Sequence, residues 1–170
     1  MTQPAPSKHE LHVTTGDCEI VMTRAFDAPR ALVFDAFTKP ELIRRWLLGP
    51  DGWSMPVCEV DLRVGGAFRY AWRNDADGRE FGLHGTYSAI SPGERIVYVE
   101  NFDQPWYPDD ATIATTFVEE RGLTTVTMTQ RFVSREARDI ALESGMTTGV
   151  ATSFDRLESV LGRKEASESS

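Results

Sequence analysis

A chain of 170 residues, 41% hydrophobic and 26% charged, has the length and composition of one globular domain, which excludes an intrinsically disordered protein. The formal net charge of −8 disfavours binding to nucleic acid and to anionic membranes, because their phosphates are also negative. No stretch approaches the roughly 18 apolar residues of a membrane span, and the N-terminus lacks the apolar core of a signal peptide. We therefore expect a cytoplasmic protein without membrane insertion, in which Cys18 and Cys58 are reduced.

One strand and two short helices are predicted first. Apolar residues alternate over 17–26, which predicts a strand, and Arg24 is the exception on its apolar face. A short helix is expected over 29–38. A second, angled helix is expected over 40–46, because a proline interrupts the first one.

Six further strands are predicted between residues 54 and 133. Turn residues such as Gly65-Gly66 separate runs in which apolar and polar residues alternate. The links are too short for parallel crossovers, so the strands should form an antiparallel meander. The expected strands are 57–64, 67–73, 80–90, 94–102, 111–120 and 123–133.

A long helix is predicted over 135–161, after the N-cap residue Ser134. Apolar residues recur along it at spacings of three or four, and at about 1.5 Å per residue it is long enough to cross a whole sheet. We therefore expect an α+β domain over 17–162, with a curved antiparallel sheet of about seven strands around this C-terminal helix. Residues 1–16 are expected to be a flexible lead-in and residues 163–170 a flexible tail.

Two glycines, Gly145 and Gly149, lie one turn apart in the middle of this predicted helix. Each should cost about 1 kcal/mol relative to alanine. One explanation is a close approach of the helix to the sheet. The other is that residues 145–150 form one wall of a ligand pocket, and both explanations remain open at this point.

Many aromatic residues on or beside the strands indicate either an ordinary core or an apolar pocket with a few polar groups that orient a ligand. The polar candidates in the strands are His84, Glu100, Thr115 and Gln130. Parity places Glu100 with Tyr98 and Phe102, where a carboxylate would be costly unless it were paired or protonated. The candidate ligand-binding residues are Tyr70, Trp72, His84, Tyr98, Glu100, Phe102, Trp106, Phe117, Met128, Gln130, Phe132, Met146, Gly149 and Val150.

No catalytic residue, metal or cofactor is predicted. His and Cys residues do not cluster at metal-ligand spacing. No glycine-rich phosphate loop leads from a strand into a helix, and no nucleophile elbow is present. His84, as a lone residue, is typical of a hydrogen-bonded structural histidine.

Several motifs, in order along residues 17–161, resemble the SRPBCC superfamily, also called START or birch-pollen-allergen-like. The most distinctive is Cys58-Glu59-Val60-Asp61-Leu62-Arg63-Val64-Gly65-Gly66. Within the superfamily the chain is similar to the bacterial proteins named after the activator of the heat-shock-protein-ninety ATPase. The other matching segments are 24–29, 45–46 with 49–50, 85–87, 116–117, 127–132, 145–146 and 154–157.

The resemblance implies a helix-grip fold and a cavity between sheet and helix that takes lipids, polyketides or similar molecules. Three functions follow as hypotheses. The first is non-enzymatic binding of a small apolar or aromatic molecule. The second is a cavity enzyme of the polyketide cyclase or hydrolase type that uses Glu100 or His84. The third is a co-chaperone-like interaction module or a homodimer, with Trp53 or Trp106 as an anchor.

Overall fold

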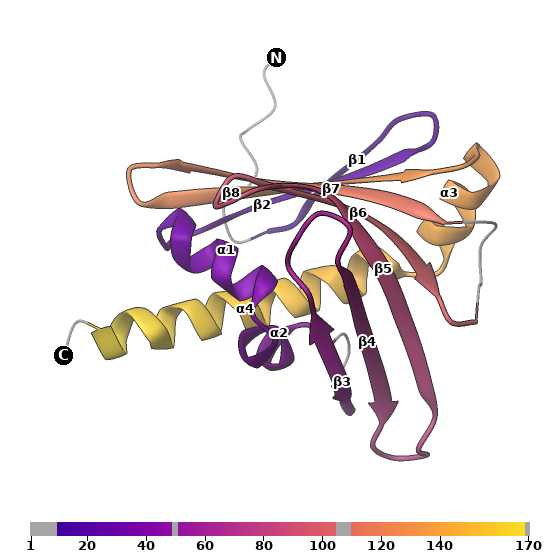
Figure 1. Ribbon diagram of the computed structural model, residues 1–170, viewed down its shortest axis with the longest axis horizontal. Helices are drawn as coiled ribbons and strands as arrows, with labels where there is room; N and C mark the ends of the chain where they lie inside the picture. Colours follow the sequence, from indigo (N-terminus) through magenta and orange to yellow (C-terminus); the bar gives the residue numbers. More distant parts are fainter. Residues whose placement is uncertain (1–9, 49–50, 105–109, 169–170) are drawn as a thin grey trace.

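The computed structural model describes residues 10–48, 51–104 and 110–168. Within them the chain forms one curved, fully antiparallel sheet of eight strands and four helices (Figure 1). The strands lie in the order β1-β2-β8-β7-β6-β5-β4-β3. They are β1 His12–Thr15, β2 Glu19–Phe26, β3 Trp53–Val60, β4 Ala67–Asn74, β5 Glu80–Ser91, β6 Arg95–Phe102, β7 Ala111–Glu120 and β8 Leu123–Phe132.

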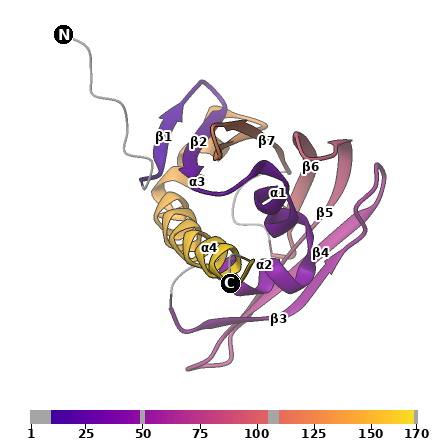
Figure 2. The same cartoon turned by 90° about the vertical axis from the view of Figure 1, so that its left-hand side faces the viewer.

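The helices lie on the concave side of the sheet. They are α1 Arg30–Thr38, α2 Pro40–Trp46, α3 Arg135–Glu143 and α4 Met146–Glu168. Figure 2 looks along α4 and shows the sheet curving around it from β1 to β3, with α1 and α2 between them. The α+β class, the helix-grip arrangement and the meander from β3 to β8 are as the sequence predicted.

The sheet has one strand more than expected, because β1 lies in the stretch predicted to be a lead-in. It pairs with β2 in the register His12↔Thr23 to Thr15↔Ile20. All four of its residues are exposed, so neither of its faces requires apolar residues. Its sequence therefore lacks the alternation of apolar and polar residues that predicts a strand. At the other end of the chain, α4 continues to Glu168, into the stretch expected to be a tail.

The predicted long helix is in fact two helices. α3 ends at Glu143, and α4 begins at Met146 after a break at Ser144 and Gly145. Gly145 has φ +84°, which is the left-handed region that favours glycine. Gly145 is therefore explained by the break, and neither explanation offered for a glycine in mid-helix applies to it.

The face of β2 that meets α4 carries a buried arginine. Arg24 is 2% exposed, and its guanidinium donates to Asp155 Oδ1 at 2.6 Å and to Glu158 Oε2 at 3.1 Å. Both acceptors belong to α4. The exception in the apolar pattern of β2 is therefore an ion pair that attaches the C-terminal helix to the sheet.

Aromatic rings fill the space between α1, α2, α4 and the sheet. Phe154 of α4 meets Phe26 edge-on at 5.6 Å between ring centroids and Trp46 at 5.8 Å. Phe37 of α1 lies 5.9 Å from Phe154 and 5.3 Å from Phe117. These rings fill the space beside Phe154, near the middle of α4.

Candidate functional site

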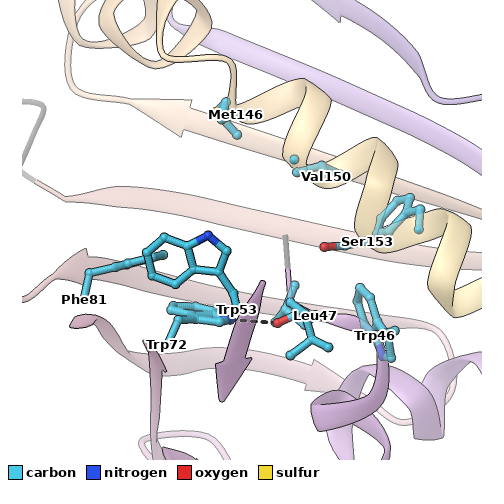
Figure 3. A pocket seen from close by; sticks show the side chains of 11 residues that line it. Trp46, Leu47, Trp53, Trp72, Phe81, Met146, Val150 and Ser153 are labelled. Carbon is cyan, nitrogen blue, oxygen red and sulfur yellow. Dashed lines mark hydrogen bonds between the residues drawn. The ribbon is translucent and has the colours of Figure 1, made fainter. Parts of the chain in front are cut away.

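A hollow of about 310 Å³ lies between the first turns of α4 and the ends of strands β3, β4 and β5 (Figure 3). Its size is at the lower end of the range of small-molecule sites. Among the described residues, no ionisable side chain lines its walls, and almost none of the lining surface is polar. The lining residues are Trp46, Leu47, Leu48, Trp53, Trp72, Phe81, Met146, Gly149, Val150, Ser153 and Phe154.

Three rings form the sheet-side wall. Trp72 and Phe81 are directly opposite each other on β4 and β5, and their rings stack at 4.9 Å with an angle of 23° between planes. Trp53, at the start of β3, meets Phe81 edge-on at 5.3 Å and 73°. The wall is therefore a corner made of one stacked pair and one nearly perpendicular indole.

Two of the lining tryptophans are fixed by hydrogen bonds from their indole nitrogens. Trp46 Nε1 donates to the carbonyl of Ala36 at 2.9 Å. Trp72 Nε1 donates to the carbonyl of Leu47 at 2.7 Å, which is the dashed line in Figure 3. The second bond joins β4 to the segment after α2, so it connects two lining residues, Trp72 and Leu47, directly.

The opposite wall is the first part of α4, with Met146, Gly149 and Val150. A Cβ built on Gly149 would have no heavy atom within 4 Å, so the helix does not approach the sheet closely at this position. Of the two explanations for this glycine, the geometry favours the second, in which a missing side chain leaves room beside the helix. Ser153, one turn further along α4, points its hydroxyl towards the hollow in Figure 3.

Four of the residues predicted from the sequence line this hollow, namely Trp72, Met146, Gly149 and Val150. Others lie elsewhere on the concave side. Tyr70 and Tyr98 line a separate void of about 60 Å³ nearer α2.

The remaining apolar candidates are mostly part of the packed core. Phe117 is buried against Phe34 and Phe37 of α1. Phe132 lies in the core cluster that includes residues of α3, and Phe102 and Met128 are half-buried against the same cluster. Trp106 lies outside the described residues.

His84 is placed on the convex face of the sheet, away from the hollow. Its side chain is 48% exposed, and its Nδ1 lies 2.8 Å from Asp103 Oδ1. It is opposite Arg69 on β4, and Arg69 also binds Asp103, at 2.7 Å. The prediction of His84 as a pocket residue thus fails on parity, because position 84 alternates with the inward-facing Leu83 and Gly85.

Glu100 and Gln130 are on the concave side, as their parity predicted, but they do not line the hollow. Both are buried, and Gln130 Nε2 donates to Glu100 Oε1 at 3.5 Å. Burial raises the pKa of the Glu100 carboxyl from 4.5 to about 8, because desolvation disfavours the charged form. The group is therefore largely a neutral acid at pH 7.

The cavity enzyme hypothesis placed Glu100 or His84 in the cavity, within reach of a substrate atom. His84 is on the convex face, and Glu100, although it is buried on the concave side, does not line the hollow. In the described part of the chain, no group of three or more His, Cys, Asp or Glu side chains is placed to hold a metal ion. Among the same residues, no helix is long and apolar enough to cross a membrane.

Most of the lining came from residues that sequence patterns had not assigned to the pocket. Leu47 and Leu48 follow α2, Trp53 begins β3, and Phe81 is 42% exposed near the start of β5. Such positions at the ends of elements meet only when the sheet curves. The one signal is Trp53 itself, a tryptophan beside a loop, which the sequence suggests as an anchor for a partner.

Comparisons with known proteins agree with the fold. The family described as Activator of Hsp90 ATPase homolog 1-like protein matches residues 27–162. No curated protein matches significantly. Among solved structures, a protein from Rhodobacter sphaeroides is similar at 25% identity and a TM-score of 0.82, over 91% of this chain and 99% of its own.

Two further structures have similar values. A protein from Staphylococcus epidermidis is 29% identical over 89% of this chain and 94% of its own, with a TM-score of 0.77. One from Chromobacterium violaceum is 27% identical over 85% and 96%, with a TM-score of 0.75. With most of its length matched by the family and its fold shared by these structures, the chain belongs to the family of Activator of Hsp90 ATPase homolog 1-like proteins.

Proposed function

We propose that this chain binds a small hydrophobic or aromatic molecule in the hollow between α4 and strands β3 to β5. The observation that carries the proposal is Gly149. A glycine inside a helix costs about 1 kcal/mol relative to alanine, and here no steric contact requires it. This loss of helix stability is explained if function requires the space beside the helix at Gly149 to stay open for a ligand.

The walls of the hollow support an apolar ligand. The described residues that line it are uncharged, so a ligand that enters exchanges water for apolar contacts and leaves no charge of these residues unpaired. At about 25 cal/mol per Å² of apolar surface removed from water, a small molecule enclosed here can gain several kcal/mol. The fold of the family is compatible with such a cavity.

Substitutions at Gly149 test the proposal. Gly149→Leu should fill the hollow and abolish the rise in melting temperature that ligands cause, whereas Gly149→Ala should stabilise the free protein by about 0.5–1 kcal/mol. The matched control is Gly162→Ala, on the same helix and also with nothing within 4 Å of the added Cβ. It should stabilise the helix similarly and leave ligand binding unchanged.

The measurement is a thermal-shift screen of the four proteins against lipids, polyphenols and polyketides. The proposal holds if one class raises the melting temperature of the wild type and of Gly162→Ala but not that of Gly149→Leu. It fails if no class produces a shift, or if the shift persists when the hollow is filled.

A further inference from the structure

The shape of the hollow, its low polarity and one indole donor without an acceptor among the described residues specify its ligand more narrowly. We infer that the occupant is an uncharged, flat molecule of about two fused rings that carries a hydrogen-bond acceptor on its edge. This inference rests on the proposed function, since it concerns the same hollow. It adds the size, the planarity and the polar contact of the ligand.

Size comes first. An engineered cavity of about 150 Å³ in another protein holds one benzene ring. The hollow, at about 310 Å³, has room for about two such rings. A long acyl chain would need a tunnel, but the packed rings of Phe154, Trp46 and Phe37 close the space towards the C-terminal half of α4.

The arrangement of the wall favours a flat ligand. Trp72 and Phe81 are stacked within 23° of parallel, and Trp53 stands at 73° to Phe81. A planar ring that lies along the stacked pair therefore presents its edge or its face to Trp53. Aromatic pairs in such offset or edge-to-face positions gain about 0.5–1.5 kcal/mol beyond area burial. A flexible alkyl chain lacks this gain and loses more rotational freedom on binding.

One polar atom in the wall, the indole nitrogen of Trp53, can donate a hydrogen bond to a ligand. The indole nitrogens of Trp46 and Trp72 donate to carbonyls of the chain, whereas Trp53 Nε1 has no acceptor among the described residues. Figure 3 draws this nitrogen on the ring edge nearest α4, across the hollow. An indole N–H can only donate, so the matching ligand group must accept. The Ser153 hydroxyl can donate or accept and therefore sets no such requirement.

The absence of charge follows from the same wall. Within residues 10–48, 51–104 and 110–168, no ionisable residue lines the hollow. The nearest guanidinium above Trp53, that of Arg79, lies 5.8 Å from the ring centroid and bonds Asp77 at 3.0 Å. Arg79 is 71% exposed, so it packs on the indole from the solvent side. A carboxylate or ammonium ligand would lose its hydration in the hollow without gaining a counter-charge.

Calorimetric titration with four probes tests the inference. Coumarin is flat, bicyclic and uncharged and has an acceptor on its edge. Naphthalene lacks the acceptor, 2-naphthoate adds a charge, and 1-decanol is a flexible chain of similar size. Coumarin should bind at least about tenfold more tightly than 2-naphthoate, because the carboxylate of 2-naphthoate loses its hydration in the hollow. It should also bind at least about tenfold more tightly than 1-decanol, because the alkyl chain lacks the stacking gain.

The variant Trp53→Phe tests the hydrogen bond, because it keeps an aromatic ring, although a smaller one, and removes the N–H donor. It should lower the affinity for coumarin by about tenfold and leave that for naphthalene within about twofold. The comparison of the two probes on one variant cancels any general loosening of the wall. If the variant unfolds, the ratio of coumarin to naphthalene affinity in the wild type still decides the acceptor requirement.

Three results would overturn the inference and leave the proposed function standing, provided that binding is lost in Gly149→Leu. They are tighter binding of 1-decanol than of coumarin, tighter binding of 2-naphthoate, and equal losses of coumarin and naphthalene in Trp53→Phe. If no probe binds in a way that Gly149→Leu abolishes, this ligand class is excluded, and the wider thermal-shift screen decides the proposed function separately.

Discussion

Glu100 is a buried carboxyl group that forms no ion pair with another described residue. The substitution Glu100→Gln preserves its shape and retains an oxygen that can accept from Gln130 Nε2. It removes only the ability to ionise. The difference between the two proteins should therefore appear as a dependence of stability on pH.

The magnitude follows from the raised pKa. Burial raises the pKa of Glu100 from 4.5 to about 8, so between these values the folded chain holds a proton that the unfolded chain has released. In this window the unfolded state binds fewer protons than the folded state, and stability falls as the pH rises. At about 1.36 kcal/mol per pKa unit, the loss between pH 5 and pH 8 is about 4 kcal/mol. Below pH 4.5 both states are protonated and the loss disappears.

Urea unfolding at pH 5 and pH 8 measures this effect. The wild type should lose about 4 kcal/mol more than Glu100→Gln over that interval. Glu59→Gln, at an exposed glutamate on the edge strand β3, is the control and should follow the wild type. Parallel pH profiles for the wild type and Glu100→Gln would refute the reasoning, because the buried carboxyl would then not be held in its neutral form.

Two further predictions concern the helix break and the cysteines. Gly145→Ala should destabilise the protein by about 1 kcal/mol or more in urea unfolding, because φ is +84° there, and an unchanged or higher stability would contradict the break. Burial raises the pKa of the Cys58 thiol to about 11, so iodoacetamide at pH 8 should alkylate the half-buried Cys18 well before Cys58. Intact and peptide mass spectrometry would follow both sites, and equal rates in the folded protein would be inconsistent with the burial of Cys58.

The predictable part of the fold was the part in which local pattern and burial coincide. In β4, Phe68, Tyr70 and Trp72 alternate with exposed or half-buried residues, and all three face the core. β1 gave no such signal, because both of its faces are exposed. The long apolar stripe of the C-terminal helix was real, but it continues across the break at Gly145, so periodicity alone could not reveal two helices.

The candidate site was predictable only where side chains lie in the middle of regular elements. Met146 and Val150 follow helical spacing on α4, and Trp72 follows strand parity on β4. Trp53 and Phe81 lie near the ends of strands, and they meet Trp72 only because the sheet curves and a hydrogen bond fixes the segment after α2. Convergence of this kind depends on tertiary geometry, for which a sequence pattern carries no signal.

A small apolar molecule in the hollow beside Gly149 should perturb the residues that line it. Titration of the ¹⁵N-labelled protein with coumarin, followed by heteronuclear NMR, measures this residue by residue. The largest shifts should be those of the Gly149 and Val150 amides and of the Trp53 and Trp72 indole N–H groups. Shifts confined to the convex face around His84, or no saturable shift at all, would contradict it.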